Sequence, residues 1–144
     1  MGGVKLLPEA RELLESGALA HMATVNPDGS PQLTVVWVGL DGDEIVSGHL
    51  FRNRKVQNVE RDPRVSISLE ASEGMLQGAM KHYLVIKGQA RVEEGGAPEL
   101  LQRLAHTYLG PDVEFPAMED PPPGFVIRTT PERVYGVGPW SDGP

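Results

Sequence analysis

A tight-turn sequence, Asn-Pro-Asp-Gly at residues 26–29, constrains the fold of this chain more than any other feature. It separates an apolar segment at 18–25 from a segment rich in β-branched residues at 32–38. Proline, aspartate and glycine in such a turn are typical of a connection between antiparallel strands. The pattern predicts a β-hairpin, so the chain is expected to begin as an antiparallel meander.

The rest of the chain continues with short, turn-linked strands. Residues 65–69 alternate apolar and polar side chains with the period of a half-buried strand. A basic helix at 53–62 is expected to end before a proline, and an amphipathic helix at 97–109 before a glycine. Further strands are expected at 44–47, 83–92, 125–128 and 133–137, a first helix near 8–14, and loops at 71–80 and 111–124.

These elements define the expected fold class. Six or seven sequential strands with three short peripheral helices predict a mainly β fold, an antiparallel barrel formed by a single domain over residues 1–144. Gly88, inside one of the longer strands, indicates a bulge or a close approach of another backbone.

Composition and missing motifs exclude several functional classes. The chain has no cysteine, so it has neither a disulfide scaffold nor a thiol nucleophile. Its net charge of −7 argues against general nucleic-acid binding, and no apolar run reaches the roughly 18 residues of a membrane span. A nucleophile elbow, a Walker loop and a dinucleotide-binding glycine motif are all missing. We therefore expect a cytoplasmic protein that binds neither nucleic acid nor membrane.

One basic cluster departs from this acidic balance. Residues 52–64 contain five basic side chains against two acidic ones, a local charge of +3. On a helix, Lys55 and Arg54 precede Asn58 by three and four residues, so the three side chains can converge. A helix start with free backbone N–H groups and these side chains can hold a phosphate. A solvated basic face is the alternative interpretation.

Some of the histidines and tryptophans are candidates for a binding site. None of the four histidines has a metal-ligand spacing to another, so no metal site is predicted. His49, after Ser47 and Gly48, is either a solvated loop residue or a donor to the polar edge of a ligand. Trp37 is expected to pack in the core or at a dimer interface, with a ligand-ring platform as the alternative. Trp140, in a tail rich in glycine and proline, is expected to dock onto a partner subunit or over a ligand.

Four segments occur in a specific order and together span much of the chain. They are Asp28-Gly29-x-Pro31, Val35-Val36-Trp37-Val38, the run from Lys55-x-x-Asn58 to Val65, and Tyr83-Leu84-Val85-Ile86-x-Gly88-x-Ala90. In order and spacing they resemble the pyridoxamine-phosphate-oxidase-like split-barrel superfamily. Residues 94–101 and 134–140 look like its actinobacterial branch, which depends on coenzyme F-420, a deazaflavin.

The resemblance implies a homodimer of split barrels with two cofactor sites at the subunit interface. It places the cofactor phosphate at Lys55, with Asn58 beside it. Many relatives carry an arginine two residues before this lysine, where the present chain has Asn53, and Arg54 or Arg52 would substitute for it. The other implied cofactor contacts are Gln32, Thr34, Val36 and Trp37 along the ring, Ser47, Gly48 and His49 at its other edge, and Lys81, Tyr83 and Trp140 from the partner subunit.

For activity, the resemblance implies that a hydride passes from reduced F-420 to a small unsaturated or carbonyl-containing molecule. Backbone N–H groups at 36–38 would bias the charge of the ring, and the final proton would come from solvent, His49 or Tyr83. Two alternatives stay open: an FMN-binding oxidase or flavin reductase that uses the same Lys55 site, and a non-catalytic protein that binds F-420. Loops at 75–80 and 116–123 are candidates to line the substrate pocket.

Overall fold

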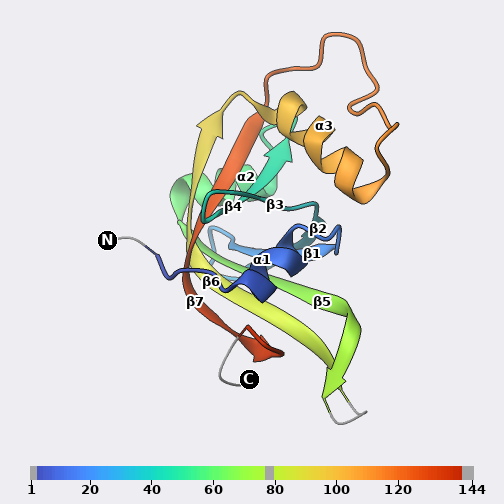
Figure 1. Cartoon of the computed structure of the whole chain (residues 1–144). Coiled ribbons are helices and arrows are strands. Elements are labelled where there is room, and N and C mark those ends of the chain that lie inside the picture. The colour runs from blue at the N-terminus through green and yellow to red at the C-terminus, as the bar shows by residue number, and fades with distance from the viewer. Residues whose placement is uncertain (1–2, 77–79, 141–144) are drawn as a thin grey trace.

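The computed structural model describes residues 3–76 and 80–140, and within them it has seven strands and three helices. The strands are β1 (Ala20–Val25), β2 (Pro31–Val36), β3 (Gly39–Asp41), β4 (Glu44–His49), β5 (Arg64–Leu76), β6 (Met80–Glu94) and β7 (Phe125–Val137). The helices are α1 (Pro8–Leu14), α2 (Arg54–Arg61) and α3 (Ala97–Tyr108). The expected mainly β split-barrel fold with short peripheral helices is confirmed (Figure 1). In this described part of the chain, no helix has the length and apolar composition of a transmembrane segment.

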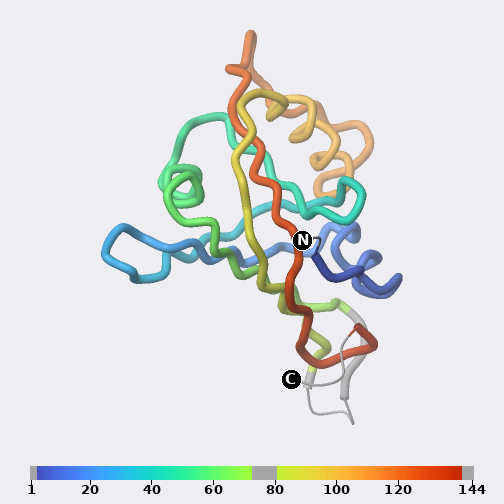
Figure 2. The backbone as a smooth tube through the Cα atoms, turned by 90° about the vertical axis from the view of Figure 1, so that its left-hand side faces the viewer, coloured from blue at the N-terminus to red at the C-terminus, as the bar shows by residue number. Residues whose placement is uncertain are grey.

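All seven strands join one antiparallel sheet, in the order β2-β1-β5-β6-β7-β4-β3. The long strands β5, β6 and β7 form its centre, and they carry the β1–β2 hairpin on one side and the β3–β4 hairpin on the other. In Figure 2 the β1–β2 hairpin crosses the long β6–β7 pair instead of running along it, so the sheet is strongly curled. The curl encloses a core of fully buried side chains that includes Met22, Ile67 and Ile86.

Helix α2 forms because the sequence specifies both of its ends and its buried face. Asn53 is the N-cap, and its side-chain oxygen accepts a hydrogen bond from the backbone N–H of Val56 at 3.1 Å. Val56 and Val59, three residues apart, are both buried against the sheet. The helix ends at Asp62, which takes an extended conformation before Pro63.

The prediction of a loop at 71–80 is wrong for most of that range. Strand β5 continues to Leu76 and β6 begins at Met80, while residues 77–79 lie outside the described residues. The β5–β6 ladder has a register shift after Glu70, and this irregularity breaks the alternation by which a strand is recognised in sequence. The candidate pocket loop in this region is therefore largely a pair of strand ends.

The two strands expected at 125–128 and 133–137 are instead one continuous strand, β7. Pro131 breaks the sequence pattern, but the β6–β7 ladder accommodates it through a register shift that leaves Glu132 without a cross-strand partner. Next to this shift, a Cβ atom on Gly88 would lie 2.2 Å from a carbonyl oxygen of β7. The predicted close backbone approach at Gly88 is confirmed.

Candidate functional site

A cleft of about 280 Å³ lies where β2 and β4 approach α2 and α3. Five residues predicted for the cofactor site line it: Val36, Trp37, Gly48, His49 and Lys55. Its remaining lining residues were not predicted: Leu19, Val35, Leu101 and Phe115. The wall is therefore mostly apolar, with one imidazole and one ammonium group as its titratable side chains.

Lys55 differs from the other basic residues of the cluster at 52–64. Arg52 pairs with Glu60 at 2.6 Å, and Arg64 pairs with Asp62 at 2.8 Å. Lys55 lies in the first turn of α2, is half-buried, and has neither an ion pair nor a hydrogen bond among the described residues. Burial lowers the pKa of its ammonium group, because no carboxylate offsets the lost hydration.

The remaining arginines of the cluster point to the β1–β2 turn. The guanidinium group of Arg61 donates a hydrogen bond to the carbonyl oxygen of Val25. Hydrogen bonds from Ser30 lower the pKa of Asp28, and the charge of Arg54 lowers it further, so Arg54 acts electrostatically on this turn. Neither arginine lines the cleft.

His49 is buried, so its interpretation as a solvated loop residue is wrong. It is the last residue of β4, with 7% of its surface exposed, and its Nε2 lies 2.8 Å from the hydroxyl oxygen of Ser47. Burial, and secondarily the nearby charge of Lys55, lower the pKa of His49 to about 4. The imidazole is therefore neutral at physiological pH. Ser47 lies behind it and holds its orientation.

Asn58 and Gln32 attach α2 to the β1–β2 hairpin. Asn58 is fully buried, and its amide nitrogen donates to the hydroxyl of Thr24 at 3.0 Å and to the side-chain oxygen of Asn26 at 3.1 Å. Thr24 in turn donates to the side-chain oxygen of Gln32 at 3.3 Å. Both amide hydrogens of Asn58 are thus engaged within the protein. This network positions the helix that carries Lys55 and does not itself line the cleft.

Two aromatic rings, Trp37 and Phe115, line the cleft, and a third, Tyr108 of α3, packs against Trp37 outside the lining. The ring of Trp37 stacks on Tyr108, with centroids 5.3 Å apart and an interplanar angle of 14°. Phe115, from the loop after α3, meets Trp37 at 5.2 Å and 58°. The hydroxyl of Tyr108 donates to the carbonyl oxygen of Ala18 at 2.7 Å and accepts from the N–H of Val38 at 3.0 Å. Trp37 therefore packs within its own subunit and also presents part of its ring to the cleft. The N–H of Val38 is engaged by Tyr108, so it is not among the groups open to a ligand ring.

The residues expected from a partner subunit lie outside the cleft of their own chain. Lys81 and Tyr83 are in β6, and Lys81 lines a neighbouring hollow of about 420 Å³. Trp140 is 7% exposed and belongs to the core, so the expectation that it stands apart from the core is wrong. Its indole N–H donates to the carbonyl oxygen of Tyr83 at 2.8 Å. Gly138 allows this fold-back, because a Cβ atom there would lie 2.4 Å from the Trp140 ring.

Thr34, another predicted cofactor contact, has a side-chain hydroxyl without a hydrogen-bond partner among the described residues. It lies on β2, two residues before Val36, and its hydroxyl oxygen is buried with no hydrogen-bond partner among the described residues. Buried hydroxyl groups are normally paired, so an unpaired one in a structure without bound molecules is an open position for a ligand or a water.

The curled antiparallel sheet with three short helices is a split-barrel fold. Residues 6–138 match the sequence profile of pyridoxamine 5'-phosphate oxidase, and the chain belongs to this family. Among solved structures, an F420 reductase is 28% identical to it, with a TM-score of 0.73 over 89% of this chain and 98% of the other.

Two further structures are more distant in sequence. A putative pyridoxamine 5'-phosphate oxidase from Listeria innocua is 21% identical, with a TM-score of 0.63 over 87% of this chain and 92% of its own. An FMN-binding protein from Syntrophomonas wolfei is 11% identical, with a TM-score of 0.67 over 92% of this chain and 86% of its own. At these identities the likeness shows the shared fold alone. No curated protein matches the sequence.

Proposed function

We propose that this protein is an F-420-dependent oxidoreductase that reduces a small unsaturated or carbonyl-containing organic molecule. The observation that carries the proposal is Lys55, a half-buried ammonium group without an ion-pair partner in the described chain, at the edge of an apolar cleft. The similarity to an F420 reductase over 89% of the chain supports the choice of cofactor.

The residues of the cleft fit such a cofactor. Lys55 and the first backbone N–H groups of α2 would hold its phosphate, since the Asn53 cap engages only the N–H of Val56. The apolar surfaces of Val36 and Trp37 suit a flat ring. Thr34, two residues before Val36 on β2, has a buried hydroxyl without a partner among the described residues, and we propose that it hydrogen-bonds to the bound cofactor.

The chemistry is divided between cofactor and protein. When bound, reduced F-420 supplies a hydride to an electrophilic carbon of the acceptor. Lys55 binds the anionic end, and the apolar walls exclude water from the site. His49 has a pKa of about 4, so it is uncharged at neutral pH and can donate a hydrogen bond without acting as a cationic acid. We therefore assign the final proton to solvent.

We also propose that the site is completed in a homodimer. The sheet edge next to the cleft exposes three apolar side chains: Leu19 (54% exposed), Leu33 (67%) and Val35 (54%). Such a strand edge with apolar side chains is usually covered in a soluble protein. A second subunit packed there would cover it and could bring Lys81 and Tyr83 to the cleft of the first.

Titration of the purified protein with F-420 and, in parallel, with FMN tests the proposal. Cofactor fluorescence would be measured for the wild type, for Lys55→Ala and for Lys87→Ala, a lysine of β6 that does not line the cleft. We expect tighter binding of F-420 than of FMN, loss of binding in Lys55→Ala, and no change in Lys87→Ala. Preference for FMN, or binding indifferent to Lys55, would overturn the assignment.

FMN remains the second candidate cofactor, because an FMN-binding protein shares this fold with a TM-score of 0.67. The same Lys55 position would then hold the FMN phosphate in an oxidase or flavin reductase. A non-catalytic role is supported by a different observation: His49, a candidate proton donor that lines the cleft, is uncharged at neutral pH. A panel of acceptors mixed with protein and reduced F-420 separates binding alone from hydride transfer.

A further inference from the structure

In the loop between α3 and β7, the stretch from Val113 to Phe115 is bound by one glutamine side chain. Gln102, on α3, donates from its amide nitrogen to the carbonyl oxygen of Val113 at 2.9 Å. Its amide oxygen accepts from the backbone N–H of Phe115 at 3.0 Å. Both polar ends of one amide therefore bind the same short stretch of backbone.

Few other polar contacts hold this loop. For the described residues 114–122, the bond from the N–H of Phe115 to Gln102 is the only hydrogen bond found. Met118 in the same stretch is 46% exposed. In Figure 1 the loop stands away from the sheet and passes beside α3. The position of Phe115 thus depends on Gln102 more than on the loop itself.

Phe115 is the part of the loop that reaches the cleft. Its ring contacts Trp37, and both rings give apolar surface to a cleft that Lys55 lines with a charged group. Trp37 is fixed from behind by Tyr108, whose hydroxyl bonds the backbone at Ala18 and Val38. One wall of this apolar region is therefore rigid, and the other is supplied by a ring on a loop.

We propose that Phe115 determines the size of the organic acceptor that the cleft admits, and that Gln102 is its positioning residue. The inference rests on the proposed function, because it assigns the side of the cleft at Phe115 to the acceptor, the surfaces of Val36 and Trp37 to the cofactor ring, and Lys55 to the cofactor phosphate. A smaller side chain at 115 opens the wall without removing a hydrogen bond, since the bond to Gln102 comes from the backbone. Loss of the Gln102 amide leaves the ring intact but removes its support.

The first test compares two acceptors of different size in the cofactor-loaded enzyme. Mesityl oxide is a small enone, and benzylideneacetone carries a phenyl ring on a similar enone. We expect Phe115→Ala to raise kcat/KM for benzylideneacetone relative to mesityl oxide by about tenfold, an amount typical of a hydrophobic pocket that gains or loses a side-chain-sized volume. Gln102→Ala should shift the ratio in the same direction by a smaller factor, mainly through KM. Gln102→Glu, which keeps the acceptor for the Phe115 N–H, should fall between Gln102→Ala and the wild type.

Met118→Ala is the matched control, because Met118 belongs to the same loop and does not line the cleft. It should leave the ratio unchanged, and none of these variants should change the F-420 affinity more than about threefold, which corresponds to less than 1 kcal/mol.

The second test needs no cofactor and uses the two tryptophans of the chain. In a heteronuclear NMR spectrum of isotope-labelled protein, benzylideneacetone should shift the indole N–H signal of Trp37. The Trp140 signal, from a core residue bonded to the carbonyl oxygen of Tyr83, serves as the internal control. The affinity read from the Trp37 signal should increase in Phe115→Ala.

The outcomes separate this inference from the proposed function. Failure of the wild type to bind F-420 or FMN would overturn the proposed function, while the Trp37 signal would still report on the aromatic wall. An unchanged enone ratio and an unchanged Trp37 response in Phe115→Ala would overturn the present inference. So would a loss of cofactor affinity in that variant, because Phe115 would then belong to the cofactor contacts.

Discussion

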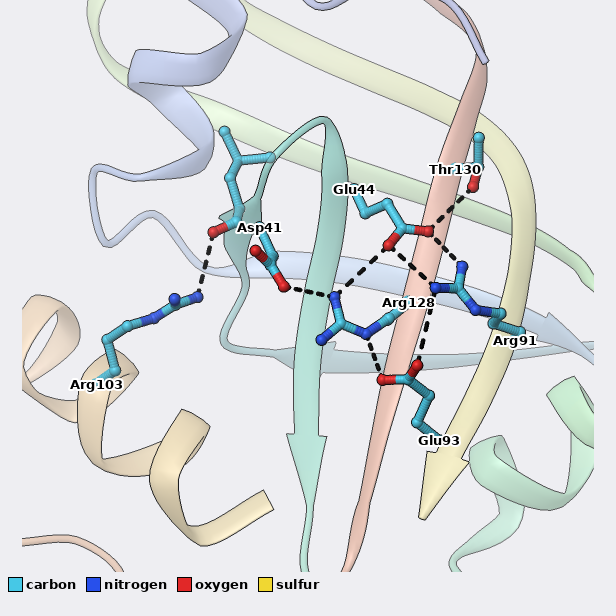
Figure 3. A network of polar contacts seen from close by, with 8 residues as sticks. Asp41, Glu44, Arg91, Glu93, Arg103, Arg128 and Thr130 are labelled. Carbon is cyan, nitrogen blue, oxygen red and sulfur yellow. Dashed lines mark hydrogen bonds and ion pairs between the residues drawn. The ribbon is translucent and has the colours of Figure 1, made fainter. Parts of the chain in front are cut away.

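Arg128 and Lys55 differ in their ion-pair partners. Around Arg128, on β7, the charges are matched: its guanidinium group pairs with Asp41 at 2.7 Å and with Glu93 at 2.6 Å, and Glu44 joins Arg128 to Arg91 (Figure 3). We call these five residues the arginine network. In the cleft, Lys55 is half-buried, and no carboxylate of the residues that the structure describes pairs with it.

The pKa shifts of the two cations have opposite signs, because the folded protein favours the charged form of Arg128 and disfavours that of Lys55. Hydrogen bonds to Asp41 and Glu93 raise the pKa of Arg128, whereas burial lowers the pKa of Lys55. Charges that serve to join strands are neutralised within the chain. An unneutralised buried charge is unfavourable until an anion arrives, and this is typical of binding sites. The comparison therefore separates cations that are paired within the chain from one that has no ion-pair partner among the described residues, in a protein that is acidic overall.

The largest expected effect comes from removal of the unmatched charge. Lys55→Met should weaken F-420 binding about 100-fold, because a charge-assisted contact to phosphate is worth about 2 to 3 kcal/mol. The free energy of unfolding without cofactor should not fall, since the variant removes a cation that burial disfavours. Calorimetric titration and urea unfolding would measure the two quantities. Equal losses of binding and stability would mean that Lys55 is a structural cation.

A pH experiment probes the cleft through His49. Its pKa is about 4 in the folded protein and near the ordinary 6.5 when unfolded, so the unfolded chain binds more protons between these values. The contribution of His49 to the free energy of unfolding should be fully present above about pH 6.5 and should decline as the pH falls toward 4. The expected loss between pH 7 and pH 5 is about 2 kcal/mol. Urea unfolding at the two pH values would measure it.

His49→Gln should lose this pH dependence, because it removes the titrating group. The arginine network should contribute little over the same range, since hydrogen bonds from Arg128 and Arg91 lower the pKa values of Asp41 and Glu44 and keep both ionised. An identical decline in His49→Gln would assign the pH dependence to other groups.

Removal of Arg128, the cation at the centre of the arginine network, should lower stability and leave cofactor affinity unchanged, which is the reverse of the result expected for Lys55→Met. Arg128→Met should lower the free energy of unfolding by about 1 to 2 kcal/mol, because it leaves three carboxylates close together in a partly buried position. Cofactor affinity should stay within experimental error of the wild type. Arg64→Met, which breaks one exposed pair with Asp62, is the control and should leave stability within experimental error of the wild type.

The smallest expected effect concerns the cap of the helix that carries Lys55. Asn53→Ala should cost about 1 kcal/mol of stability, because the N–H of Val56 loses its acceptor. Asn53→Asp keeps an acceptor at that place and should retain most of the stability, as thermal unfolding would show. If both variants were as stable as the wild type, Asn53 would not be acting as a cap.

Local chemistry in the sequence was sufficient to predict most of the fold. The Asn-Pro-Asp-Gly turn, the capped basic helix and the amphipathic helix at α3 all depend on neighbouring residues, and all are present. Prediction failed at 71–76 and at Pro131, where a register shift in a long-range ladder decides the structure. Such shifts depend on the partner strand, which local periodicity does not include.

The site was predictable in part for the same reason. Lys55, His49 and Trp37 carried chemical signals and were found in one cleft. Phe115 was missed, although it is the only aromatic residue in the loop at 111–124 and this could have drawn attention to it. Whether Lys55 lacks a partner could not be predicted, because its isolation depends on where distant carboxylates are placed.

The pairing of β4 with β7 also sets the order in which the protein can be completed as it is synthesised. Strand β4 emerges early from the ribosome, but Ser47 has to wait for Ile127, its cross-strand partner near the end of the chain. The β1, β2, β5 and β6 strands can associate before that point, because their partners are nearer in sequence. His49 and Gly48 therefore reach their final places only after translation has passed β7, and the cleft that they line forms only then.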